Sequence, residues 1–147
     1  MANAIDGNVL AFDFGEKRIG VALGQALTGS ARPLETMTNN AHSLWQEIDR
    51  LVADWSPSAF VVGMPLAEDG TDQPMTGKAR SFAGKLADRY RISVHHTDER
   101  YTTKVAESLF AENRRGGRAR AKDARNKDSL AAKLILEQWF EQHFAGG

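Results

Sequence analysis

The sequence predicts an α/β fold with a mixed five-stranded sheet in the order 3-2-1-4-5 and helices on both faces. Three short β-type runs lie close together near the N-terminus, which indicates antiparallel pairing through short connections. After them, helical and strand patterns alternate, which is typical of βα crossovers between parallel strands. The 147 residues, 41% of them hydrophobic, suit one domain with its own core over residues 1–147.

The first three expected strands cover residues 9–14, 19–23 and 32–38. Between the first two, Gly15-Glu16-Lys17-Arg18 predicts the turn of a hairpin. Pro33 lacks the backbone N–H that a central strand needs, so the third strand is expected at an edge of the sheet.

The rest of the chain alternates between helical and strand patterns. Leu44, Ile48, Leu51, Val52 and Trp55 recur at the spacing of an amphipathic helix. The remaining expected elements are strands at 59–63 and 92–97, a helix marked by Phe82, Leu86 and Tyr90, a helix at about 102–112, and a last helix from Asp128 or nearby to about Phe144. No role follows for the loop at 64–76. We interpret Gly63 and Gly70 as turn residues, because their spacing matches no phosphate-binding loop.

Composition excludes several functional classes. The chain has no cysteine, which excludes disulfides, thiolate nucleophiles, iron–sulfur clusters and cysteine-based zinc sites. No apolar run approaches the ~18 residues of a membrane span, and residues 1–8 show no signal-peptide pattern. We therefore expect a cytoplasmic protein that has no membrane partner.

The net charge is zero, but the charges are unevenly distributed. Residues 1–73 hold ten acidic and four basic side chains, whereas residues 74–147 hold nine and fifteen. The excess lies in one run, in which a single acid, Asp123, accompanies Arg114, Arg115, Arg118, Arg120, Lys122, Arg125 and Lys127. The run at 114–127 lacks apolar periodicity, so we predict a mobile basic segment that binds a nucleic-acid backbone, with a solvated linker as the alternative.

Acidic side chains occur at three positions where they could form one site. Asp13 ends the apolar first strand, where an unpaired charge is costly, although an Asp before a glycine also suits a turn. Asp98 and Glu99 directly follow the fifth strand, where they could equally belong to a polar helix-capping loop. Asp128 is predicted at the start of the last helix, either as a cap or on the inward apolar face that it shares with Ala131, Ala132, Ile135 and Trp139.

Together these acids predict a metal site. The first and fifth strands flank the fourth, so their carboxyl ends lie where ligand sites form in α/β sheets, and the last helix can cover them. Converging carboxylates need a cation, and oxygen ligands favour Mg²⁺ or Mn²⁺. Zinc is disfavoured because no metal-ligand spacing connects His42, His95, His96 and His143. A pair of such ions beside a basic segment suits phosphodiester hydrolysis.

Four segments carry a family resemblance that covers almost the whole chain. They are Ala11-Phe12-Asp13-Phe14-Gly15 with Lys17-Arg18-Ile19-Gly20-Val21-Ala22, then Val61-Val62-Gly63-Met64-Pro65-Leu66 with Asp69-Gly70-Thr71, then Asp98-Glu99-Arg100-Tyr101-Thr102-Thr103, and Lys127-Asp128-Ser129-Leu130-Ala131-Ala132. In this order and spacing the chain resembles the YqgF (RuvX) family, known as Holliday junction resolvases and implicated in maturing the 5′ end of pre-16S ribosomal RNA.

The resemblance implies an RNase H-like fold and a divalent-metal-dependent nuclease. It implies that Asp13, Glu99 and Asp128 are the catalytic, metal-binding acids, with Glu99 rather than Asp98 as the ligand. Arg18 is expected either to contact a phosphate or simply to flank a β-turn. The expected substrate is pre-16S rRNA, with a pre-ribosomal particle as a partner of the monomer or homodimer. A four-way DNA junction and a non-catalytic nucleic-acid-binding module are the alternatives.

Overall fold

The computed structural model describes residues 7–67, 69–98 and 121–144, with side chains from residue 127 onward in the last of these ranges. Its elements are the strands β1 (Asn8–Phe14), β2 (Arg18–Gln25), β3 (Ser30–Thr38), β4 (Ala59–Met64) and β5 (Ser93–Asp98), and the helices α1 (Leu44–Trp55), α2 (Pro74–Tyr90) and α4 (Ala121–Phe144). The expected helix at 102–112 lies outside the described residues. The other expected elements are present.

The strands form one sheet in the order β3-β2-β1-β4-β5, which confirms the predicted order. β1 pairs antiparallel with β2 and β2 with β3, whereas β1, β4 and β5 are parallel to one another. β3 lies at an edge, as Pro33 predicts, and the register of its pairing with β2 shifts beside that proline, between Val21 and Ala22. The carboxyl ends of β1, β4 and β5 therefore point the same way.

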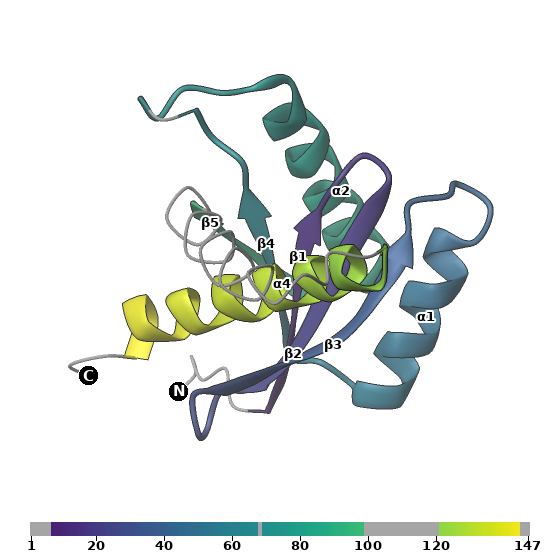
Figure 1. The fold of residues 1–147 in the computed structure, drawn as a ribbon. Coiled ribbons are helices and arrows are strands. Elements are labelled where there is room, and N and C mark those ends of the chain that lie inside the picture. Colours follow the sequence, from purple (N-terminus) through teal and green to yellow (C-terminus); the bar gives the residue numbers. More distant parts are fainter. Residues whose placement is uncertain (1–6, 68, 99–120, 145–147) are drawn as a thin grey trace.

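Helices cover both faces of the sheet (Figure 1). α1 and α2 pack on one face, and α4 runs across the strands on the other. Both faces of the central strands are therefore buried, so β1 is apolar at four consecutive positions from Val9 to Phe12, each fully buried. This pattern is expected for a strand that is covered on both sides.

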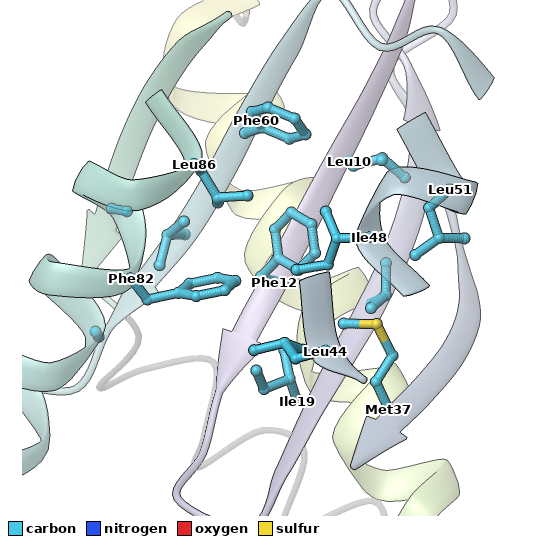
Figure 2. Packing of buried hydrophobic residues seen from close by; sticks show 14 of the residues in the cluster. Leu10, Phe12, Ile19, Met37, Leu44, Ile48, Leu51, Phe60, Phe82 and Leu86 are labelled. Atoms are coloured by element: carbon cyan, nitrogen blue, oxygen red, sulfur yellow. The ribbon is translucent and has the colours of Figure 1, made fainter. Parts of the chain in front are cut away.

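Each face has its own hydrophobic core. The larger core lies beneath α1 and α2, where Phe12 is packed between Ile48 of α1 and Phe82 of α2 (Figure 2). The smaller core lies beneath α4 and consists of Val9, Ala11, Ala22, Ala59, Val61, Ala132, Ile135, Leu136, Trp139 and Phe140. Its sheet side is made of small and β-branched residues, which let α4 approach closely.

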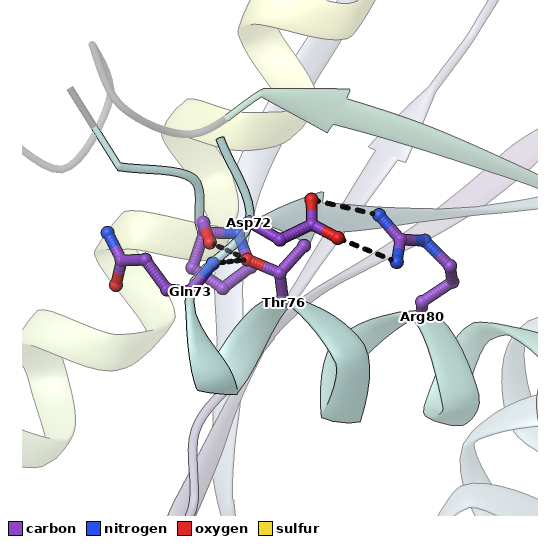
Figure 3. A network of polar contacts seen from close by, with 5 residues as sticks. Asp72, Gln73, Thr76 and Arg80 are labelled. Atoms are coloured by element: carbon purple, nitrogen blue, oxygen red, sulfur yellow. Dashed lines mark hydrogen bonds and ion pairs between the residues drawn. The ribbon is translucent and has the colours of Figure 1, made fainter. Parts of the chain in front are cut away.

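A buried threonine fixes the loop after β4 to the start of α2 (Figure 3). The Thr76 hydroxyl donates to the carbonyl of Pro65 and accepts from the backbone N–H of Gln73 at 2.8 Å. Next to it, Arg80 contacts both carboxylate oxygens of Asp72, at 3.2 and 3.4 Å. The sequence indicates no role for the loop at 64–76. In the structure, Thr76 ties both the start of this loop, at Pro65, and its end, at Gln73, to the first turn of α2.

Replacing Thr76 by valine is expected to lower the free energy of unfolding by about 1–3 kcal/mol. Valine keeps the shape but leaves the Pro65 carbonyl without its donor and the Gln73 N–H without its acceptor, in a place where Thr76 is fully buried. Urea unfolding measures the effect. Thr71→Val is the matched control, because that hydroxyl bonds Asp69 at the exposed surface. Equal stability of the two variants would contradict the prediction.

The last helix begins earlier than predicted. α4 starts at Ala121 rather than at Asp128, so residues 121–127, for which no regular structure was predicted, are helical. The prediction relied on apolar periodicity, which these residues lack. They are instead rich in alanine, lysine and arginine, whose intrinsic helix propensity is high. Asp128 therefore lies inside the helix and is not its N-cap.

No helix within the described ranges is long and apolar enough to cross a membrane.

Candidate active site

Asp13 lies on the face of the sheet that α4 covers. Along β1, Leu10 and Phe12 belong to the core beneath α1 and α2, whereas Val9 and Ala11 belong to the core beneath α4. Because side chains alternate along a strand, Asp13 shares the face of Val9 and Ala11. It is half-buried at the carboxyl end of the strand, where the apolar pattern gives way to a polar group.

Gly20 brings α4 to this carboxylate. Gly20 is the cross-strand partner of Asp13 in the β1–β2 pairing. A Cβ atom on Gly20 would overlap the backbone carbonyl of Asp128 and lie 2.9 Å from the backbone nitrogen of Ser129. The α4 backbone thus rests directly on the strand beside Asp13. Since opposed antiparallel residues have Cα atoms about 5 Å apart, the backbone of Asp128 lies close to Asp13 in space.

Small residues continue this close approach along the helix. A Cβ atom on Gly24 would lie 2.7 Å from Cδ2 of Leu136 and 2.8 Å from Cε2 of Phe140. Of the residues predicted to share the inward face of the helix with Asp128, Ala132, Ile135 and Trp139 are buried in the core beneath α4, whereas Ala131 is only half-buried. Gly20 and Gly24 are the residues that permit this approach, and an isolated glycine inside a strand is the sequence signal for it.

Arg18 binds the Asp128 carboxylate. Its Nε donates to Oδ2 of Asp128 at 2.6 Å, across 110 positions of sequence. The arginine side chain is 41% exposed and that of Asp128 22%, so the pair lies at the rim of the site and stabilises the fold by no more than about 1 kcal/mol. Arg18 neutralises one acid of the site and keeps part of its guanidinium open to solvent.

The chemistry of this site follows from its donors. Two carboxylates lie on one face at the carboxyl end of the parallel strands, and hard oxygen donors of this kind suit Mg²⁺ or Mn²⁺. Within the described part of the chain, no group of three His, Cys, Asp or Glu residues is placed to hold a metal ion. The third predicted ligand, Glu99, lies outside the described residues.

The histidines take no part in this arrangement. His95 faces α4, where its ring centroid lies 4.9 Å from that of Trp139. Burial lowers the pKa of His95 and favours its neutral form. His96 lies on the opposite face, where partial desolvation of its ring and then the charge of Arg80 lower its pKa. The expectation that these two neighbours point to opposite faces is confirmed.

Comparison with known proteins decides the family. The family model for RuvX, described as Holliday junction resolvase, matches residues 7–142. The chain belongs to the RuvX family.

Two curated relatives are similar to this chain over nearly their whole length. A protein of Edwardsiella ictaluri is 45% identical over 138 residues, which cover 92% of this chain and 96% of the relative. One of Escherichia coli O7:K1 is 44% identical over 141 residues, which cover 95% and 100%. Both are provisionally named pre-16S rRNA nucleases. The RuvX resemblance seen in the sequence is thereby confirmed.

Solved structures support the fold. The Thermus thermophilus RuvC in complex with a Holliday junction substrate has a TM-score of 0.60 at 18% identity and covers 94% of this chain and 96% of its own. The yeast mitochondrial Holliday junction resolvase has a TM-score of 0.53 at 12% identity, with coverages of 97% and 84%. These likenesses confirm the RNase H-like architecture of this RuvX protein.

The predicted nucleic-acid contacts of this RuvX protein are only partly described. Arg114, Arg115, Arg118 and Arg120 lie, like Glu99, outside the described residues. Lys122 and Arg125 belong to the first turns of α4, where the structure describes the backbone but not the side chains. Lys127 is half-buried, directly before Asp128 on the same helix. Arg18 does reach the site, but as the ion-pair partner of Asp128.

Proposed function

We propose that this RuvX protein is a divalent-metal-dependent nuclease that matures the 5′ end of pre-16S ribosomal RNA. Family membership makes the chain a nuclease, an enzyme that hydrolyses nucleic acid. The substrate follows from relatives about 45% identical over nearly their whole length, which are named for this RNA. The observation that supports the catalytic part is the contact of Gly20, the cross-strand partner of Asp13, with the backbone of Asp128.

Glu99 completes the proposed set of catalytic acids. Asp98 is the register partner of Met64 in the β4–β5 pairing, and Met64 belongs to the core beneath α1 and α2. Strand alternation therefore assigns Asp98 to the face opposite Asp13. This supports Glu99, the next residue along, as the glutamate that acts together with Asp13 and Asp128.

Mg²⁺ or Mn²⁺ fits the donors, since Asp13, Glu99 and Asp128 would offer only carboxylate oxygens. A bound pair of these ions would activate a water molecule and stabilise the leaving 3′-oxygen. The role of the protein is to position the ligands: β1 and α4 hold acids from two distant segments of the chain in one rigid arrangement. The packing of α4 against the sheet beneath Ala132 and Ile135 excludes water from the floor of the site.

Arg18 acts at the rim of this site. The contact of its Nε with Asp128 holds that carboxylate over the sheet. The exposed part of its guanidinium can donate to a substrate phosphate, a group whose geometry suits arginine. The basic side chains Arg114, Arg115, Arg118, Arg120, Lys122, Arg125 and Lys127 would hold the phosphate backbone without reading sequence.

A four-way DNA junction is the second candidate substrate, because the family model that matches this chain is described as a Holliday junction resolvase. Two symmetric cuts in a junction require a two-fold dimer, whereas a single cut in an RNA precursor requires only a monomer. Action on a pre-ribosomal particle would place the enzyme in the cytoplasm, where bacterial ribosomes assemble.

Cleavage of two substrates in parallel tests the proposal. Wild-type protein with Mg²⁺ or Mn²⁺ is incubated with a pre-16S 5′-leader RNA and with a four-way DNA junction, and the products are mapped at nucleotide resolution. We expect metal-dependent cuts in the RNA that EDTA abolishes. Paired symmetric cuts in the junction alone, by a dimer in sedimentation, would favour the resolvase. Cleavage of neither substrate, with binding intact, would contradict the nuclease proposal.

A further inference from the structure

A hollow on the opposite side of the sheet from Asp128 has the features of a nucleotide site. It has a volume of about 400 Å³ and lies between the β1–β2 turn, the start of α1 and the middle of α2. Its size falls within the range of small-molecule sites. Phe14, Trp45 and Phe82 are its aromatic lining, and Lys78 and Lys85 are its cations.

The aromatic lining is a preformed wall. The ring centroids of Phe14 and Phe82 lie 4.9 Å apart, and those of Trp45 and Phe82 lie 5.6 Å apart. Phe82 is buried, whereas Phe14 and Trp45 are half-buried and leave part of each ring facing the hollow. Such rings offer a stacking surface to any nucleobase, because every base has a π-face.

The cations are arranged along one face of α2. Lys78 and Lys85 are two turns apart and both exposed. Lys78 is held by Glu16 at 2.8 Å, which lowers the pKa of that carboxyl. Lys85 forms no ion pair with any residue in the described ranges. Its charge is therefore available to an anionic occupant of the hollow.

A second hollow of about 350 Å³ continues the first along α2. Trp45 and Lys85 line both. In the second hollow the guanidinium of Arg89 lies over the Trp45 ring, 5.6 Å from its centroid, and is fixed by Asp49 at 2.6 Å. The Asp49 pKa is lowered to about 2, chiefly by its hydrogen bond from Arg89 and then by that from Tyr90. Trp45 is thus held in place between the two hollows.

The hollow lies at the same end of β1 as Asp13. Phe14 directly follows Asp13 on β1, so the two side chains lie on opposite faces at the same end of the strand. A nucleic-acid strand that crosses the carboxyl end of β1 reaches the acids on one face and the aromatic hollow on the other.

We propose that the hollow lined by Phe14, Trp45 and Lys85 is a subsite for an unpaired nucleotide that flanks the cleavage position, with its base on the aromatic wall and its phosphate on Lys85. Combined aromatic and lysine contacts are typical of single-strand recognition. The inference names part of the substrate of the proposed nuclease and rests on that function. Its test measures binding, so it succeeds or fails separately from cleavage.

The test compares binding of three probes by fluorescence anisotropy, without divalent metal so that nothing is cleaved. They are a blunt RNA duplex, the same duplex with a single-stranded extension, and the duplex with an abasic extension of equal length. We expect wild-type protein to bind the extended duplex about tenfold more tightly than the other two, in line with stacking of one base. Lys85→Glu should remove this advantage.

Arg32→Glu is the matched control, because Arg32 also lies beside a tryptophan, 5.4 Å from the ring centroid of Trp55, at the far end of α1. This variant has the same charge change and should keep the advantage of the extended duplex. A single-stranded RNA hexamer should also quench tryptophan fluorescence in wild-type protein, and Trp45→Phe should abolish the quenching. Equal affinities of the Lys85 and Arg32 variants, an abasic extension that binds as well as the natural one, or quenching that survives Trp45→Phe would each overturn the proposal.

Discussion

Replacing Asp13 by asparagine is expected to slow cleavage by at least about 10³-fold while leaving the protein folded. Asparagine keeps the size of the side chain but removes the charge that the site needs to hold a divalent cation. The fold should remain, because Asp13 ends β1 beyond the four fully buried positions from Val9 to Phe12. Single-turnover cleavage at saturating metal, together with circular dichroism, measures both effects.

Metal-dependent melting distinguishes a role of Asp13 in metal binding from a general loss of activity. Mg²⁺ or Mn²⁺ should raise the melting temperature of the wild-type protein, because a ligand that binds only the folded state stabilises it. Asp13→Asn should reduce that shift. Asp54→Asn has the same charge change on the exposed face of α1, where Asp54 pairs with Arg50 at 3.6 Å, and should leave shift and cleavage unchanged. Equal melting shifts in wild type and Asp13→Asn would contradict the metal site.

Replacing Gly20 by alanine is expected to lower the free energy of unfolding by about 3 kcal/mol and to abolish cleavage even where the variant remains folded. The new methyl group would overlap the Asp128 carbonyl. Because that neighbour is helix backbone rather than the tip of a flexible side chain, α4 itself must move. The movement carries the Asp128 carboxylate away from Asp13. Guanidinium unfolding and the cleavage assay measure the two consequences.

Two further glycine variants show how the effect depends on the atoms that the new methyl group meets. Gly77→Ala places its methyl group on α2 with nothing within 4 Å, so it should stabilise the protein by up to about 1 kcal/mol through helix propensity. In Gly24→Ala the new methyl group meets the side-chain tips of Leu136 and Phe140 as well as the Ser30 carbonyl. It should destabilise the protein but leave residual cleavage. Wild-type stability and activity of Gly20→Ala would show that α4 does not rest on this residue.

Much of the fold is predictable because burial follows local pattern. Val9 to Phe12 are apolar without alternation, which indicates a strand covered on both faces, and that is the position of β1 in the sheet. Pro33 removes a donor and thereby places its strand at an edge. The start of α4 was predicted wrongly, since residues 121–127 form helix by intrinsic propensity without any apolar face to reveal it.

For the candidate site, the sequence predicts which residues belong to it but not how they are arranged. Asp13 follows an apolar strand, and Asp128 lies on the inward face of a helix with Ala132, so each could be named from its neighbours. That the Asp128 backbone rests on Gly20, the cross-strand partner of Asp13, and that Arg18 binds Asp128 across 110 positions of sequence, was decided by tertiary structure. Local pattern specifies which face of a strand or helix is buried, because burial depends on periodicity. Which residues of two distant elements touch depends on strand register and on how closely a helix can approach, and these are set only when the complete core packs.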